Sequence, residues 1–89
     1  MSEREARQVV DGGIYQHVDG LRYKVVNTLP YAEGFERTGL INKVVLYTQL
    51  DNSDIYPAGT LWVRSQRDFL RSIRRGSQLV PIFRLIQRN

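Results

Sequence analysis

The fold is decided by one stretch, Gly13-Ile-Tyr15-Gln-His17-Val-Asp19-Gly20-Leu-Arg-Tyr23. Residues 13–18 and 21–26 alternate in polarity, and the dipeptide Asp19-Gly20 between them favours a two-residue type I′ turn. That turn sets the register of the two strands. The predicted pairs are Val18 with Leu21, Gln16 with Tyr23, Ile14 with Val25, His17 with Arg22 and Tyr15 with Lys24. The sequence thus predicts a hairpin with one apolar face and one aromatic, cationic face.

Three further strands follow downstream. Residues 43–50 and 60–64 alternate in the same way and are separated by a segment rich in Asp, Asn, Ser, Pro and Gly, which favours turns. Residues 78–86 predict a fifth strand. Because proline cannot donate a hydrogen bond to a neighbouring strand, Pro81 indicates an edge strand or a bulge.

One helix is predicted between the fourth and fifth strands. Ser65 and Asp68 have the spacing of a capping box, in which a hydroxyl accepts a backbone hydrogen bond at the start of a helix. The helix is expected from about Gln66 to Arg75, and Gly76 would end it because glycine is favoured just beyond a helix.

Length and connectivity predict the fold class. An 89-residue chain fits one small domain, 1–89, with a single thin core. Residues 1–10 are expected to form a short N-terminal helix or a flexible lead, and residues 31–42 a long irregular loop. Five short strands with mostly local connections predict a mainly β fold, either a small bent antiparallel sheet or a partly open SH3-like barrel with one short helix.

Composition and charge narrow the function classes. The chain has no cysteine, which excludes disulfides and thiolate metal sites. It has neither an apolar run of roughly 20 residues nor a signal-like N-terminus, so a cytoplasmic protein is expected. Residues 1–42 carry a net charge of −1 and residues 43–89 a net charge of +5. Arginine suits phosphate or carboxylate groups, so the basic half predicts an anionic partner; a solvated basic surface is the alternative.

Catalysis and metal binding are not expected from these residues. The chain has one histidine, His17, and the predicted register places it opposite Arg22, whose charge disfavours the imidazolium that a general base must form. Asp51 and Asp54 lack the glycine and terminal glutamate of a calcium loop, so they predict a turn. We therefore expect neither enzymatic activity nor a metal or cofactor.

These strands resemble the domain-of-unknown-function 1653 family of small bacterial and phage proteins, over residues 13–69. The matching positions are Tyr15, His17, Gly20, Tyr23 and Val25, then Val44, Val45 and a displaced Tyr47, and finally Trp62, Val63, Arg64 and Phe69. The resemblance implies a small β fold without an established activity. The chain departs from the family pattern in its longer 31–42 loop, in Ser65 where the family has proline, and in its arginine-rich continuation.

Assigning strand residues to faces gives the candidate site. The apolar set predicted to face the core is Ile14, Val18, Leu21, Tyr23, Val25, Val44, Leu46, Leu61 and Val63. The opposite face then gathers the candidate ligand-binding residues, Tyr15, His17, Arg22, Lys24, Tyr47, Trp62 and Arg64. Aromatic planes suit bases, and guanidinium groups suit phosphates. The alternative is that Trp62 and Tyr47 are buried under the helix or the last strand while Arg64 pairs with an acidic side chain.

The predicted helix carries a secondary basic patch, Arg67, Arg71, Arg74 and Arg75. Successive residues of a helix are about 100° apart, so these four arginines fall within one arc. The arc lies beside the helix stripe that is expected to be buried, Phe69, Leu70 and Ile73. Either this arc contacts phosphate or an acidic protein surface, or it is a solvated face.

Two function hypotheses follow. In the first, the protein is a non-catalytic binder of a phosphate-bearing ligand, either a nucleotide or a nucleic acid; a phage origin would fit sequestration of a host signalling nucleotide. In the second, it is a protein-interaction or inhibitor module for an acidic partner, with Tyr31 and Phe35 as anchors in the 31–42 loop. The apolar residues of the last strand also predict a homodimer or larger homo-oligomer through residues 78–88.

Overall fold

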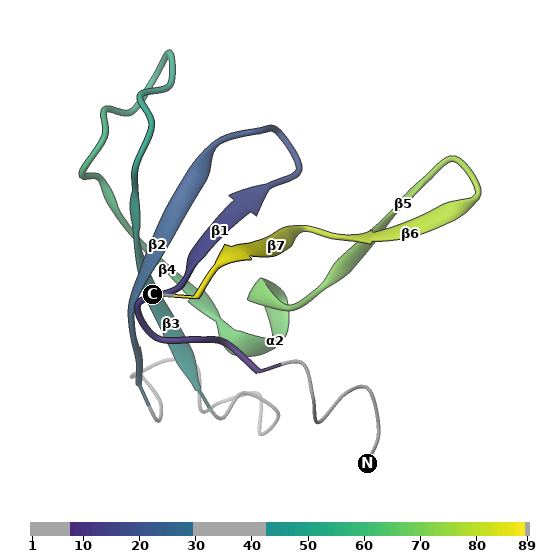
Figure 1. Ribbon diagram of the computed structural model, residues 1–89, viewed down its shortest axis with the longest axis horizontal. Helices are drawn as coiled ribbons and strands as arrows, with labels where there is room; N and C mark the ends of the chain where they lie inside the picture. The colour runs from purple at the N-terminus through teal and green to yellow at the C-terminus, as the bar shows by residue number, and fades with distance from the viewer. Residues whose placement is uncertain (1–7, 30–42, 89) are drawn as a thin grey trace.

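A computed structural model describes residues 8–29 and 43–88 of the chain. It contains a five-stranded antiparallel sheet of order β4-β3-β2-β1-β7 and a two-stranded hairpin, β5–β6 (Figure 1). The elements are β1 (Ile14–His17), β2 (Arg22–Leu29), β3 (Val44–Gln49), β4 (Leu61–Ser65), α2 (Gln66–Phe69), β5 (Ser72–Arg75), β6 (Gln78–Pro81) and β7 (Phe83–Gln87). The sheet is bent but not closed, because β4 and β7 remain its edges. The prediction of a small, mainly β fold with one short helix is confirmed.

The register of the first hairpin differs from its prediction by one residue. Tyr15 pairs with Tyr23 and Gln16 with Arg22. The predicted pairs, such as Gln16 with Tyr23, are therefore wrong. Because neighbouring residues of a strand point to opposite faces, a shift of one residue turns β1 over relative to β2. Tyr15 and Tyr23 consequently share a face.

A three-residue loop causes this shift. The backbone N–H of His17 donates to the Leu21 carbonyl at 2.8 Å, which leaves residues 18–20 in the loop instead of the predicted two. The Asp19 carboxylate accepts the Leu21 N–H at 2.9 Å and stabilises the wider turn. Gly20 ends the loop with φ +103°, a conformation that favours glycine. The three-residue loop with glycine in this position is the next most common hairpin connection after the two-residue turn.

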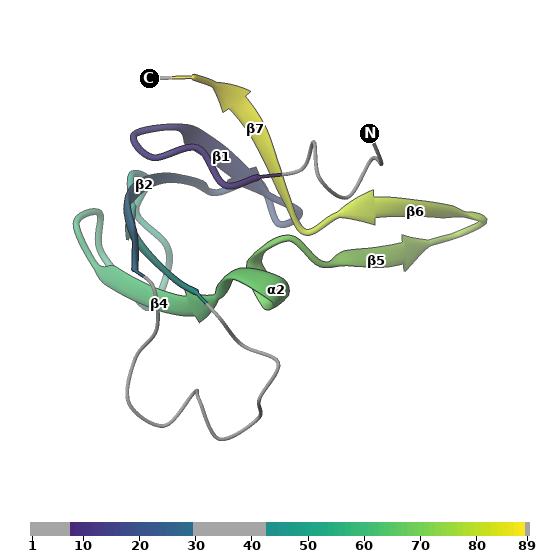
Figure 2. The ribbon, with the colours of Figure 1, turned by 90° about the horizontal axis from the view of Figure 1, so that it is seen from below.

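The core consists mainly of aromatic rings on the concave side of the sheet. Its buried members are Tyr15, Tyr23, Val25, Val45, Tyr47, Phe69, Ile82 and Phe83. Phe69 of α2 stacks on Phe83 of β7 with ring centroids 4.2 Å apart. Tyr47 meets both rings edge-on, at 5.4 and 5.5 Å. Such pairs stabilise a core beyond the effect of buried area alone. Figure 2 shows the curvature of the sheet, with α2 next to the end of β4 and β7 at the opposite edge.

The predicted assignment of faces is correct for β2, where Tyr23 and Val25 are buried and Arg22 and Lys24 are exposed, but wrong for Tyr15, Tyr47, Leu61 and Val63. Tyr15 and Tyr47, expected to face away from the core, are each 3% exposed. Leu61 and Val63, expected in the core, are 63% and 52% exposed. The reason is that Phe69 supplies an aromatic partner on the tyrosine side, so that side becomes the core. Of the predicted core, Tyr23, Val25 and Val44 are buried, while Ile14, Val18, Leu21 and Leu46 are only partly so.

The predicted helix is correct at its start and wrong in its length. The Ser65 hydroxyl accepts the Asp68 N–H at 3.1 Å, as the capping spacing predicts. The helix then ends at Phe69, and Ser72 begins β5. Gly76, with φ +61°, belongs to a two-residue hairpin loop instead of a helix end. A glycine-serine dipeptide between short strands is itself a hairpin signal.

Pro81 divides the predicted last strand in two, as β6 and β7. Between them, Ile82 donates its N–H to the Arg71 carbonyl at 2.9 Å and accepts the Val18 N–H at 3.0 Å. It thereby joins the β5–β6 hairpin to the sheet. We call this hairpin, residues 72–81, the arm; it projects from the sheet in both ribbon views (Figures 1 and 2).

The two irregular segments predicted from the sequence fall mostly outside the described residues. Residues 8–10 lie in no helix or strand. The rest of the N-terminal segment and the 31–42 loop lie outside the described part of the chain. Within residues 8–29 and 43–88, no helix has the length and hydrophobicity needed to span a membrane.

Candidate functional site

The structure separates the seven predicted ligand-binding residues into three groups. Four line one cleft: His17, Tyr47, Trp62 and Arg64. Tyr15 lies in the core instead, where its hydroxyl accepts the Val10 N–H at 2.9 Å and where burial raises its pKa. Arg22 and Lys24 are exposed on the side of β2 opposite to Tyr23. The predicted surface is therefore not a single face of the sheet.

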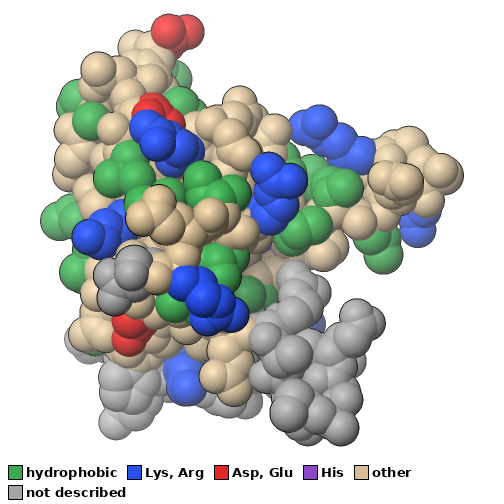
Figure 3. All heavy atoms as spheres, viewed as in Figure 1, with side chains coloured by type: hydrophobic (Ala, Val, Ile, Leu, Met, Phe, Trp, Pro, Cys, Tyr) green, Lys and Arg blue, Asp and Glu red, His purple; other side chains and the backbone are tan. Residues whose placement is uncertain are grey.

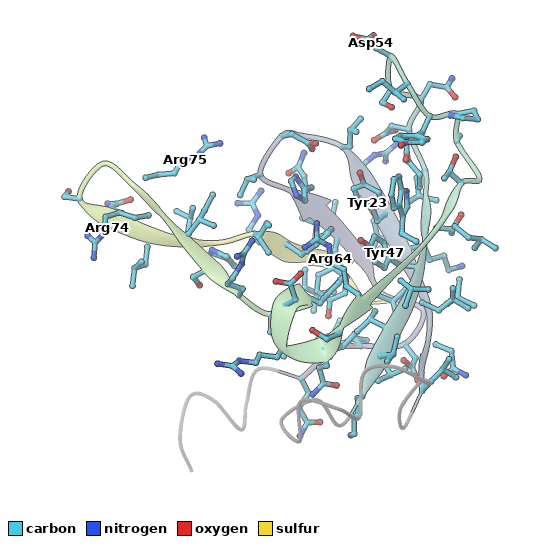
Figure 4. The ribbon with its side chains drawn as sticks, turned by 180° about the vertical axis from the view of Figure 1, so that it is seen from behind. Tyr23, Tyr47, Asp54, Arg64, Arg74 and Arg75 are labelled. Carbon is cyan, nitrogen blue, oxygen red and sulfur yellow. The ribbon has the colours of Figure 1, made fainter. Side chains whose placement is uncertain are left out.

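The cleft has a volume of about 410 Å³ and lies between the β1–β2 turn and the β3–β4 loop. Its aromatic lining comes from Tyr23, Tyr47, Tyr56, Trp62 and Phe83. Figure 4 shows Tyr23, Tyr47 and Arg64 along the concave side, with Asp54 at the end of the β3–β4 loop. Burial raises the pKa of the Tyr23 hydroxyl, and the nearby Asp19 acts in the same direction. We call this the aromatic cleft.

A buried glutamine shapes one wall of the aromatic cleft. Gln49 is 2% exposed, and its side-chain nitrogen donates to the carbonyls of Asp51 and Tyr56, each at 2.9 Å. Its side-chain oxygen accepts the indole N–H of Trp62 at 3.0 Å. These bonds fold the β3–β4 loop back and fix Trp62 edge-on to Tyr56, with centroids 4.8 Å apart. Gln49 is two residues from Tyr47 on β3, so the alternation of the strand places both side chains on one face. This relation is visible in the sequence, but no role was predicted for Gln49.

Arg64 lies at the floor of the aromatic cleft and is held by three groups. Its Nε donates to the Tyr47 hydroxyl at 2.9 Å, and its Nη1 donates to Asp68 at 2.8 Å. The guanidinium carbon lies 5.4 Å from the centre of the Phe83 ring. Burial raises the pKa of Tyr47, and the Arg64 hydrogen bond opposes that rise. The predicted alternative, a buried Tyr47 with Arg64 paired to an acid, is thus confirmed, whereas Trp62 is only half-buried.

Arg22 is held by Asp51 of the β3–β4 loop. Its Nε and Nη2 donate to the two carboxylate oxygens at 3.1 and 2.8 Å, and its backbone N–H donates to the same group at 2.9 Å. These hydrogen bonds lower the pKa of Asp51 and raise that of Arg22. The pair ties β2 to the loop, so Arg22 supports the wall of the aromatic cleft from outside.

The aromatic cleft has no surplus of positive charge. Asp19 and Asp54 also line it. Asp54 makes no ion pair or hydrogen bond within the described residues, while the charge of Arg64 is already balanced by Asp68. The cleft therefore offers aromatic surface, but two of its charged groups would repel a phosphate.

A second groove also includes Arg64, but its lining residues carry a net positive charge. It encloses about 610 Å³ and is lined by Val63, Arg64, Ser65, Arg67, Asp68 and Arg71. Asp68 lies 2.8 Å from Arg64 and 3.6 Å from Arg71. Arg67 makes no ion pair within the described part of the chain. With three arginines and one aspartate, the lining of the groove carries a net charge of +2. We call this the arginine groove.

The remaining two arginines of the predicted helical patch lie on the arm. Arg74 pairs with Leu79 and Arg75 with Gln78. As neighbours on a strand they point to opposite faces, and Figure 4 shows them directed away from opposite sides of the arm. Neither forms an ion pair with any described residue. The expected single patch on one helix face is therefore wrong, and its members are divided between groove and arm.

Charge is distributed unevenly over the molecule. Residues 69–89 contain five arginines and no acidic residue. In Figure 3, basic side chains lie along the arm, whereas an acidic side chain marks the end of the β3–β4 loop. The arm and the loop thus form ends of opposite charge.

Known proteins add nothing to this description, since neither a family model, nor a curated protein, nor a solved structure matches the chain. The resemblance to the domain-of-unknown-function 1653 family stays a prediction from the motifs.

Proposed function

We propose that the protein is a non-catalytic module that binds a phosphate-bearing ligand, and that this ligand is a nucleic acid. The observation that carries the proposal is the arginine groove. Arg64, Arg67 and Arg71 line this groove together with a single carboxylate, Asp68, so at least one guanidinium is free for an anion. Guanidinium groups bind phosphate through charge-assisted, often bidentate hydrogen bonds, which favours phosphate as the ligand.

The spread of the arginines favours a nucleic acid over a single nucleotide. Arg74 and Arg75 are neighbours on β5 and point to opposite faces of the arm. One phosphate group cannot contact both, whereas a polyanion that passes on both sides of the arm can. A nucleotide, including a host signalling nucleotide, would instead need the aromatic cleft, where Asp19 and Asp54 oppose a phosphate.

An acidic protein surface is the second candidate. Val63 lines the arginine groove and is 52% exposed, and Leu61 beside it on β4 is 63% exposed. Apolar side chains next to cations could anchor a protein partner as well as a nucleic acid. The two candidates differ in salt dependence, because only the nucleic acid releases condensed counterions on binding.

Fluorescence anisotropy with labelled 20-nucleotide single strands and 20-base-pair duplexes tests the proposal between 50 and 200 mM salt. We expect the logarithm of affinity to fall linearly with the logarithm of salt concentration. The double variant Arg67→Gln/Arg71→Gln should reduce that slope by about 1.4–1.8, the contribution of two phosphate contacts. Lys24→Gln/Lys43→Gln removes the same charge from two exposed lysines that do not line the groove and should change the slope far less.

Two results would overturn the proposal. One is the absence of oligonucleotide binding below millimolar concentration at the lowest salt. The other is an equal loss of affinity in the groove variant and the lysine variant, which would show that only total charge matters. Poly-glutamate that displaces the oligonucleotide at equal charge concentration would favour the protein-binding candidate. Tight calorimetric binding of a mono- or cyclic nucleotide would favour the aromatic cleft.

We also propose that the protein self-associates within residues 78–88, through β7. This strand is an edge of the five-stranded sheet, so one row of its backbone groups can pair with a second copy. Ile86 on it is 44% exposed. Light scattering at high micromolar concentration should give a dimer mass, and Ile86→Lys should give a monomer. A monomeric wild-type protein would contradict the proposal.

A further inference from the structure

The arm has a shape and a charge pattern that the arginine groove does not explain. It is a two-stranded antiparallel ribbon that projects from the sheet and is joined to it through Ile82. Arg74 and Arg75 lie next to its loop, on opposite faces. All three charged residues between positions 69 and 83 are arginines. The ribbon is thus positive on both faces.

Cations on both faces suit insertion between two negatively charged walls. A ribbon lying on a single strand, a membrane or a flat protein surface would use one face and leave the other arginine in solvent. The major groove of double-stranded DNA is about 12 Å wide, admits a two-stranded β-ribbon, and has a phosphate backbone on each side. Among nucleic acids this geometry selects duplex DNA, since the major groove of A-form RNA is too deep and narrow for side chains to read.

We propose that the arm inserts into the major groove of double-stranded DNA, with Arg74 and Arg75 contacting the phosphate backbones on opposite sides of the groove. This inference rests on the proposed nucleic-acid function and names the form of nucleic acid. Arg71 directly precedes β5, and Arg67 lies in α2 just before it. In the proposed complex both would contact the DNA phosphate backbone beyond the part of the groove that the arm occupies. The β3–β4 loop, whose end carries Asp54, projects from a different side of the sheet from the arm (Figures 1 and 4).

Anisotropy titrations with three ligands of one sequence test the inference: a 20-base-pair DNA duplex, its single strand, and the corresponding RNA duplex. The variants are Arg74→Gln, Arg75→Gln and both together, with Lys24→Gln/Lys43→Gln as the charge-matched control. We expect the wild type to prefer the DNA duplex. Each arm substitution should weaken duplex binding roughly three- to tenfold and lower the salt slope by about 0.9. Single-strand binding through Arg67 and Arg71 should change less.

A DNA duplex with bulky substituents at pyrimidine C5, which project into the major groove, locates the contact. Binding to this duplex should fall to the level of the double arm variant. Equal binding to the blocked and open duplexes, or equal loss of duplex and single-strand affinity in the arm variants, would overturn the inference while leaving nucleic-acid binding intact. A loss of dimerisation in the arm variants with unchanged DNA affinity would assign the arm to a second copy. Absence of binding to all three ligands would overturn the proposed function as well.

Discussion

The aromatic cleft and the arm use arginine in opposite ways. At the cleft, Arg64 is held by Tyr47 and Asp68, and Arg22 by both oxygens of Asp51. On the arm, Arg74 and Arg75 have no ion-pair partner among the described residues. The sequence motifs drew attention to the first pair, because Arg64 follows the only tryptophan and Arg22 lies in the hairpin. An arginine within a sequence motif can therefore be structural, whereas unpaired charge marks the surface that is open to a ligand.

This difference has a simple physical origin. Arg64 lies against the aromatic core, where an unpaired guanidinium would lose hydration without compensation, so a phenol and a carboxylate accompany it. The arm is solvated on both faces, and its arginines lose little by remaining unpaired.

The largest effect should come from the core beneath the cleft. Phe69 is fully buried and contacts three other rings. Phe69→Ala should lower the free energy of unfolding by about 3–5 kcal/mol, as for other buried aromatic residues. Leu79→Ala on the arm, where the side chain is 65% exposed, should change it by less than about 1 kcal/mol. Urea unfolding measures both values, and similar losses would place the arm within the structural core.

The contrast between paired and unpaired arginines should appear in stability. Arg64→Ala leaves the hydroxyl of Tyr47, a 3% exposed residue, without its donor and should cost about 1–3 kcal/mol. Arg67→Ala should stay within about 0.5 kcal/mol of the wild type. The same urea experiment serves, with Lys24→Ala as a second exposed control. An Arg64→Ala protein as stable as the wild type would return Arg64 to the list of free ligand-binding residues.

The cleft wall should depend on Gln49. Gln49→Leu removes three hydrogen bonds and should cost about 1–2 kcal/mol, because two carbonyls and the Trp62 indole lose their partner. The single tryptophan makes fluorescence a local probe. We expect its emission to shift to longer wavelength as the loop loosens. Thr48→Val, at the neighbouring position on the other side of β3, should leave the emission unchanged; a shift in both variants would contradict the assigned role.

The smallest effect should come from the Arg22–Asp51 pair, which is exposed to solvent. The pKa of Asp51 is lowered in the folded protein from its ordinary value of 3.8. Its stabilising contribution is therefore fully present above that value and is lost as the pH falls through the lower, folded-state pKa. Asp51→Asn should be less stable than the wild type at pH 7, and thermal unfolding should show this difference shrink as the pH falls below 3.8. A stability difference that is as large at pH 2 as at pH 7 would contradict the electrostatic explanation.

Part of this molecule could be read from its sequence, and part could not. Alternation located four of the strands, and the Ser65 spacing located the start of α2, because both depend on neighbouring residues. The register depended on whether Asp19-Gly20 closes a two- or a three-residue loop, and the difference of one residue reversed the faces of β1 relative to β2. Glycine at position 76 is compatible with a helix end and with a hairpin loop. The structure has the hairpin loop, so Arg74 and Arg75 lie on the arm and not on a helix. Both outcomes depend on contacts between residues far apart in the sequence, such as the stacking of Phe69 on Phe83. Local sequence patterns do not contain this information.

The central claim is that the arginine groove and the arm, where positive charge exceeds negative charge, contact the ligand, and that the aromatic cleft does not. An NMR titration of the ¹⁵N-labelled protein with a short DNA duplex tests it most directly, because every backbone amide reports separately. We predict that shift changes concentrate in residues 67–71 and 73–79 and decrease with added salt. Changes concentrated around His17, Tyr23 and Trp62, with the arm unaffected, would contradict the claim and make the aromatic cleft the binding site.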